Sequence, residues 1–103
     1  MSVKLLLLKS GDQIISDAKE IVRNEDESRV VEGYLLSKPH KILATKPVVL
    51  TENFNDERNV EITLSPWILL TEDKEMTVPK EWVITIVNPI KSIVKMYQEK
   101  VDG

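Results

Sequence analysis

A run of four leucines at residues 5–8 constrains the fold of this chain more than any other feature. A strand with one face in water alternates apolar and polar residues, so an unbroken apolar run indicates a strand that is covered on both faces. The next residues form a turn, because Gly11 accepts positive φ and Ser10 or Asp12 can bond to the local backbone. Residues 3–22 therefore predict a β-hairpin, with a short helix over residues 13–22 as the alternative.

More strand-like segments follow, separated by polar or proline-containing turns. The strands are expected at residues 29–36, 42–50, 60–70 and 82–87, and the turns at residues 23–28, 38–41, 51–59 and 71–81. Residues 60–65 alternate strictly, which indicates an antiparallel strand with one face in water. Gly33 interrupts its segment, as glycine does where a strand bends or bulges. The pattern predicts a mainly β fold whose strands lie within residues 3–87, and Gly33 is a first indication of closure.

The hydrophobic period changes after residue 87. Asn88 is a preferred N-cap, and Pro89 is tolerated in the first helical turn, so a helix is expected over residues 89–101. Its apolar side chains share one stripe, formed by Ile90, Ile93, Val94, Tyr97 and Val101. Such a short helix is not stable alone in water, so the stripe should pack on the sheet or on a neighbouring subunit.

Length and charge limit the classes of protein to which the chain can belong. With 103 residues, one domain spanning residues 1–103 is expected. The chain contains no cysteine, which suits a reducing compartment, and neither a secretory signal nor a membrane-spanning segment is visible. A cytoplasmic protein without membrane contact is therefore expected. The net charge of −3 gives no overall attraction to nucleic acid, so such binding would need a local basic patch.

The residues that usually carry catalysis are sparse and scattered. The three glycines at positions 11, 33 and 103 lie too far apart for a phosphate-binding loop. The single histidine, His40, sits in an expected turn with no nucleophile at a fixed spacing. The polar segment 51–59 lacks the ligand spacing of a calcium loop. We therefore expect no enzymatic activity, no metal and no cofactor.

One segment is locally basic, at residues 37–46. Lys38, His40, Lys41 and Lys46 have no acidic residue between them and could contact phosphates. Tyr34 is the nearest aromatic residue that could stack on a base. The alternative is a solvated basic hairpin, because Trp67 and Trp82 are as well suited to a core as to a binding surface.

Several phrases resemble the Sm-like family, whose small, strongly bent β-barrels form rings by pairing edge strands between subunits. The phrases are LLLLKSGDQIISDAKEI, GYLLSKPHKI, LSPWI and WVITIVNPIKSIVKMY, and they look like small Sm-like proteins of cyanobacterial phages. The resemblance implies a strongly bent antiparallel β-barrel, here with one C-terminal helix. It also implies a homo-oligomeric ring of five to seven copies in the cytoplasm of an infected bacterium.

Two functions follow from this resemblance. The first is binding of single-stranded RNA in phage or host RNA metabolism, by the basic segment and Tyr34. The second is a structural or adaptor ring that binds a phage or host protein, because the RNA-contacting motifs of the family have no clear counterpart here. In either case an exposed, uncharged edge strand should pair between subunits. The residues expected in that interface are Trp82, Val83, Ile84, Thr85 and Ile86.

Overall fold

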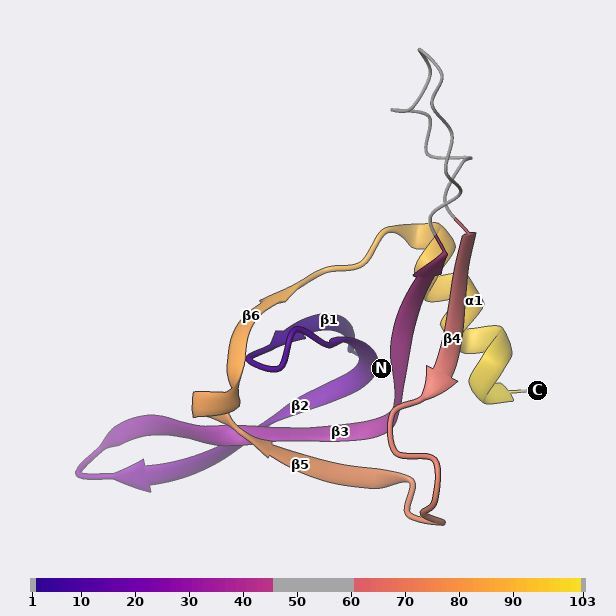
Figure 1. Ribbon diagram of the computed structural model, residues 1–103. Coiled ribbons are helices and arrows are strands. Elements are labelled where there is room, and N and C mark those ends of the chain that lie inside the picture. The colour runs from indigo at the N-terminus through magenta and orange to yellow at the C-terminus, as the bar shows by residue number, and fades with distance from the viewer. Residues whose placement is uncertain (1, 46–60, 103) are drawn as a thin grey trace.

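The computed structural model describes residues 2–45 and 61–102, and the described fold is mainly β (Figure 1). In chain order the elements are β1 (Val3–Leu8), β2 (Gln13–Glu25), β3 (Ser28–Thr45), β4 (Glu61–Pro66), β5 (Glu75–Pro79), the 3-10 helix η2 (Lys80–Trp82), β6 (Val83–Val87) and α1 (Lys91–Asp102). All strand pairs are antiparallel, in the order β4-β3-β2-β1-β6, and β5 also pairs with β3. The predicted class, a mainly β fold with one C-terminal helix, is confirmed.

The opening hairpin forms as expected, and residues 13–22 are a strand rather than a helix. In the turn, the N–H of Gly11 donates to the carbonyl of Leu8 at 2.9 Å, and Gly11 has a φ of 91°. The side chains of Leu6 and Leu8 lie in one hydrophobic cluster, and that of Leu5 packs against the cluster on the other face. Both faces of β1 therefore make apolar contacts, with Leu6 and Leu8 fully buried on one face and Leu5 and Leu7 half-buried on the other.

The prediction of a turn at residues 38–41 is wrong, because β3 continues through these residues. Between the pairs Asp17↔Ser37 and Ile15↔His40, β3 advances by three residues and β2 by two, so β3 carries a bulge there. Lys38 in the bulge has a φ of 49°, and Pro39 tolerates this position because it has no N–H to give to the ladder. Beyond the bulge β3 changes partner from β5 to β4, which bends the sheet sharply (Figure 1).

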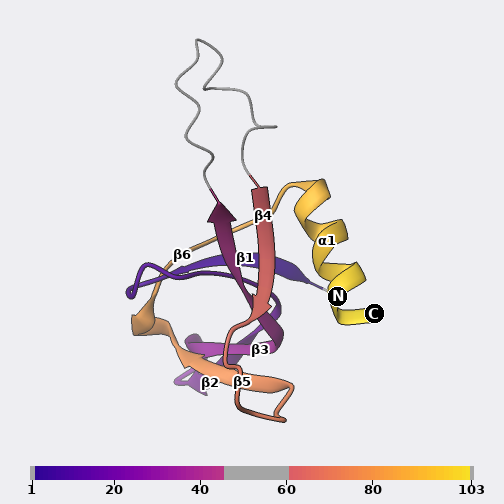
Figure 2. The ribbon, with the colours of Figure 1, turned by 45° about the vertical axis from the view of Figure 1, so that its right-hand side comes forward.

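The expected barrel is not closed. β6 pairs with β1, and β4 and β5 both pair with β3, but none of the described strands joins these two ends of the sheet (Figure 2). The outer edges of β4, β5 and β6 therefore have no strand partner within residues 2–45 and 61–102. The fold is a strongly bent open sheet.

Several boundaries differ from the sequence expectation. Strand β5 occupies much of the expected loop 71–81, residues 68–70 form a turn instead of extending β4, and the loop at 23–28 shrinks to the two-residue turn Asp26-Glu27. Helix α1 begins at Lys91, since the carbonyl of Ile90 accepts the N–H groups of Ile93 and Val94 at 3.1 Å. Asn88 is therefore not the N-cap. Residues 51–59 and the end of the segment 42–50 lie outside the described residues.

The core consists of two hydrophobic clusters on opposite faces of the bent sheet. The first contains Leu6, Leu8, Ile14, Leu36 and Val78, and the second contains Ile15, Leu64 and Tyr97. Helix α1 covers the second cluster, as its apolar stripe predicts, with Ile93, Met96 and Val101 packed around Tyr97. The first residue of the stripe, Ile90, is largely exposed.

Candidate functional site

The bulge in β3 organises the part of the surface that holds the predicted basic residues. Ser16 of β2 lies opposite the bulge, is fully buried, and donates a hydrogen bond from Oγ to the carbonyl of Ser37 at 2.8 Å. The Tyr97 hydroxyl donates to the same carbonyl at 2.8 Å and accepts the N–H of Asp17 at 3.3 Å. Tyr97 thus bridges β2 and β3 beside the bulge, and burial raises the pKa of its phenol.

His40 is part of this buried network and is not a surface ligand. Only 9% of the residue is exposed, and its ring lies edge-on to Tyr97 with centroids 5.8 Å apart. Its Nδ1 lies 2.8 Å from the carbonyl oxygen of Lys38. Because a carbonyl oxygen only accepts, Nδ1 must carry the proton in this bond. His40 therefore fixes the shape of the bulge, and the position expected for a solvated turn is in fact core.

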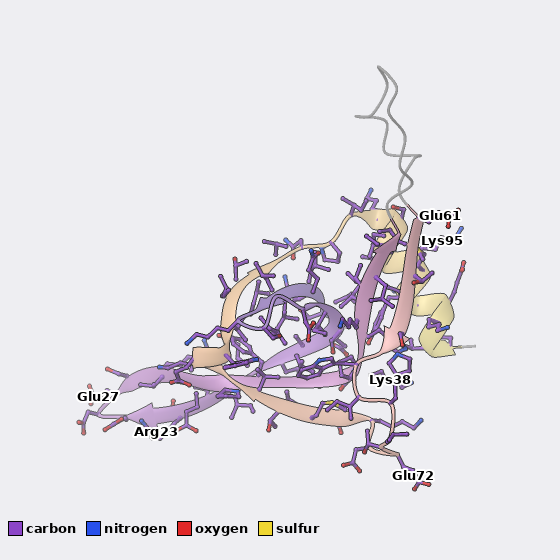
Figure 3. All side chains as sticks on the ribbon, in the orientation of Figure 1. Arg23, Glu27, Lys38, Glu61, Glu72 and Lys95 are labelled. Carbon is purple, nitrogen blue, oxygen red and sulfur yellow. The ribbon has the colours of Figure 1, made fainter. Side chains whose placement is uncertain are left out.

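Lys38 is exposed at the bulge and lines a surface groove of about 520 Å³, named here the bulge groove. Its backbone N–H donates to the carbonyl of Lys74 at 2.6 Å, which ties the bulge to the loop between β4 and β5. Two further cations, Lys74 and Lys100, line the same groove, but so do the acidic residues Glu72 and Asp73. The groove is therefore of mixed charge, with Lys38 and Glu72 on neighbouring segments (Figure 3).

The other predicted nucleic-acid residues lie apart from the groove. Lys41 forms an ion pair with Asp12 at 3.2 Å, and this hydrogen bond holds the pKa of Asp12 below its ordinary value. Tyr34 packs against the first hydrophobic cluster and is half-buried. Lys46 lies outside the described residues. The structure thus brings only Lys38 and His40 to one site, and it adds Lys74 and Lys100, which are distant in sequence.

The residues predicted for a subunit interface lie at the outer edge of the sheet. Val83, Ile84, Thr85 and Ile86 belong to β6, whereas Trp82 ends η2. Val83 and Ile86 turn toward the first hydrophobic cluster, while Ile84 is 60% exposed and Trp82 and Val87 are also exposed. Leu7 of β1 pairs with Thr85 and Leu8 pairs with Val83, so Ile84 between them has no partner on β1 and forms a bulge. Trp82, Ile84 and Val87 are therefore exposed along an edge that has no strand partner within residues 2–45 and 61–102.

A second exposed apolar group was not singled out from the sequence. The turn after β4 presents Ile68, Leu69 and Leu70, which are 48%, 70% and 100% exposed. Ile68 and Leu69 also line the bulge groove. Three consecutive exposed apolar side chains are unusual in a surface turn and commonly mark a binding surface. The sequence did not reveal that these side chains are exposed, because three consecutive apolar residues also fit a continuing strand.

The acidic and histidine side chains of the described residues bear on metal binding, and their helices bear on membrane insertion. Within residues 2–45 and 61–102, no three His, Asp or Glu side chains gather closely enough to hold a metal ion. Neither helix of this part of the chain has the length and apolar character of a transmembrane span.

Comparison with known proteins assigns the chain to a family. A family model described as "Family of unknown function (DUF6561)" matches residues 1–102. The chain therefore belongs to the DUF6561 family. No curated protein matches the sequence.

Proposed function

We propose that this DUF6561 protein is a non-catalytic assembly protein whose copies pair through open sheet edges and whose exposed apolar surface holds a protein partner. The observation that carries the proposal is the outer edge of β6, where Ile84 and Val87 are exposed on a strand with no neighbour among the described residues. An unpaired apolar edge exposes main-chain groups together with side chains that favour burial, so it readily pairs with another strand. The outer edge of β5 likewise has no strand neighbour in the part of the chain that the structure describes, and it offers a complementary partner.

The resemblance to Sm-like proteins supports a particular form of this assembly. Pairing of β6 of one subunit with β5 of the next is heterologous, and a heterologous contact that closes on itself gives a ring. Rings of five to seven copies, in the cytoplasm of a bacterium infected by a cyanobacterial phage, are the form that we propose. The apolar turn with Ile68, Leu69 and Leu70 would then be repeated around the ring as the surface that binds a phage or host protein.

The assembly is tested by placing a charge on the β6 edge. Ile84→Lys should release subunits of lower mass in light-scattering chromatography, because a lysine on an edge strand opposes pairing. Val22→Lys provides the control, since Val22 is a partly exposed apolar residue on the β2–β3 arm, away from β6. An unchanged mass for Ile84→Lys, with wild-type circular dichroism, would exclude the β6 edge from the assembly.

Binding of single-stranded RNA is a second candidate, favoured by the three lysines that line the bulge groove. In an assembly, Lys38, Lys74 and Lys100 would be repeated around an axis and could follow a phosphate backbone. The competing observation is that Glu72 and Asp73 line the same groove and that Tyr34 is half-buried against the first hydrophobic cluster, outside that groove.

Changing the three groove lysines to Gln separates the two functions. Each lost phosphate contact should reduce the slope of log affinity against log salt by about 0.7. The matched control changes three exposed lysines elsewhere, Lys19, Lys80 and Lys91, to Gln. No detectable binding of mixed-sequence RNA by the wild-type protein at about 20 mM salt, where the screening length exceeds 20 Å, would leave the protein-partner function alone.

A further inference from the structure

The outer edge of β4 borders a second groove, which shares Lys100 with the bulge groove and contains no residue of β6. The groove has a volume of about 380 Å³ and is lined by Ile62, Thr63, Leu64, Met96, Glu99 and Lys100. It lies between the edge strand and α1, which passes behind β4 in Figure 1 and lies beside it in Figure 2. Its floor is apolar, because Ile62, Leu64 and Met96 belong to the cluster beneath α1.

The main chain of β4 has groups that face outward into this groove. The N–H of Trp67 donates to the carbonyl of Pro39 at 3.0 Å, which fixes the phase of the β3–β4 ladder. Hydrogen-bonded positions alternate along an antiparallel strand, so the main chains of Ser65 and Thr63 face β3 and those of Leu64 and Ile62 face away. Within the described residues these outward groups have no strand to bond.

We propose that a second copy of this chain occupies the edge, with the two β4 strands antiparallel about a two-fold axis at Thr63. In this register Ile62 exchanges main-chain hydrogen bonds with Leu64 of the partner subunit, and the reverse pair does the same. The two Thr63 residues face each other as a pair without main-chain hydrogen bonds. The side chains of Ile62 and Leu64 from both copies then form one apolar surface between two α1 helices.

The charges around the groove favour a second copy over a strongly charged partner. Glu99 and Lys100 line the groove, and two more exposed charged residues, Glu61 and Lys95, lie on β4 and α1, the elements that border it. None of the four enters an ion pair within residues 2–45 and 61–102. Lys100 lies beside Pro66 at the end of β4, whereas Glu61 begins the strand (Figure 3). A two-fold rotation at Thr63 brings these opposite ends together, so Glu61 of one copy approaches Lys100 of the partner subunit.

This contact is independent of the proposed ring. It is isologous, with the same surface on both subunits, whereas the ring contact joins β5 to β6. Its occupant is also specific: an edge strand beside a helix could accept any extended peptide, but only a second copy places residue 63 against itself.

Cysteine cross-linking tests the two-fold axis, because the chain has no cysteine of its own. In Thr63→Cys, the paired positions would lie about 4.5 Å apart between Cα atoms, within the range that a disulfide bridges. Mild oxidation should produce a covalent dimer at least about tenfold faster than in Thr77→Cys, because paired thiols meet at a high effective concentration. Thr77 is the matched control, an exposed threonine on the edge strand β5. Equal rates for the two variants would overturn the proposal. An unrelated peptide in the groove would give this result, because it would not bring the two residues at position 63 together.

A second measurement does not depend on oxidation. Ile62→Pro removes an N–H that faces away from β3, so it should separate the copies joined at this edge, halving the mass of a two-fold dimer or of two rings joined by this contact, while leaving the β3–β4 ladder intact. Ile84→Lys should instead leave a two-fold dimer, so that failure of this contact and failure of the ring give different masses. A wild-type mass for a folded Ile62→Pro variant would overturn the two-fold contact.

Discussion

The hydroxyl of Tyr97 lies between two strands, donating to the carbonyl of Ser37 on β3 at 2.8 Å and accepting the N–H of Asp17 on β2 at 3.3 Å. It occupies the point where the bulge in β3 separates the two strands and the regular ladder is interrupted. The helix therefore does more than cover the sheet, because its one tyrosine satisfies main-chain groups that the bulge leaves without a strand partner.

We expect Ser16→Ala and Tyr97→Phe each to lower the free energy of unfolding by about 0.5 to 1.5 kcal/mol. Both hydroxyls donate to the carbonyl of Ser37, so either one can satisfy it alone. The double variant should lose more than the sum, by roughly 1 kcal/mol, because that carbonyl then loses both side-chain donors. Urea denaturation of the four proteins measures the coupling. Tyr34→Phe is the control, and strictly additive losses would contradict the shared acceptor.

The ion pair between Lys41 and Asp12 should make stability depend on pH at acidic values. The folded state lowers the pKa of Asp12 from its ordinary value of 3.8, chiefly through the hydrogen bond from Lys41. Stabilisation is therefore present above pH 3.8 and is lost as the pH falls through the lowered pKa, because the unfolded chain binds the proton more tightly. We would measure the free energy of unfolding from about pH 2.5 to about pH 6, a range that spans the ordinary pKa of an aspartate. As the pH falls, this free energy should decrease less steeply for Asp12→Asn than for wild type. Asp73→Asn is the control, and equal slopes would contradict the role of this pair.

Gly33 should tolerate no side chain. A Cβ at this position would lie 2.5 Å from the main-chain oxygen of Val78 on β5, and a backbone atom cannot move aside without shifting the strand. Gly33→Ala is expected to lower the free energy of unfolding by about 1 to 3 kcal/mol. Gly11→Ala is the informative comparison, since nothing lies within 4 Å there and only its φ of 91° opposes a side chain. A Gly33→Ala protein as stable as wild type in denaturant would mean that β5 does not pack on β3 this closely.

The turn that ends the β2–β3 arm should become more stable with turn-forming residues. Asp26 and Glu27 both have positive φ, 48° and 67°, which is typical of a two-residue type I′ turn that favours an asparagine followed by a glycine. The double variant that combines Asp26→Asn with Glu27→Gly is expected to raise the free energy of unfolding by about 0.5 to 1 kcal/mol. Lys19→Gly, on the exposed side of β2, should have the opposite sign because glycine weakens a strand. Thermal unfolding of both variants measures these changes, and an Asn-Gly variant with a melting temperature at or below that of wild type would contradict the prediction.

Local patterns in the sequence were sufficient for most of the elements. The leucine run, Gly11 and the alternation of residues 60–65 each act within a few neighbouring residues, and the hairpin and β4 follow from them. The apolar spacing of Ile93, Tyr97 and Val101 likewise predicts both the helix and the face that it buries. The basic segment was less informative, because charge alone does not distinguish Lys41, which pairs with Asp12, from Lys38, which lies open in the groove.

Pairing between distant segments was decided only by the tertiary structure. Lys38-Pro39 is turn-like on its own, yet β3 runs through it, because β2 and β4 hold the strand on either side and Ser16, Tyr97 and His40 satisfy the bulge from within. The same long-range contacts gather Lys38, Lys74 and Lys100 at one groove, and among the described residues they leave the outer edges of β4, β5 and β6 without a strand partner. The sequence therefore determines the local elements by turn chemistry and hydrophobic period. Which edges remain unpaired depends on where each strand finds its partner, and that is a property of the folded chain as a whole.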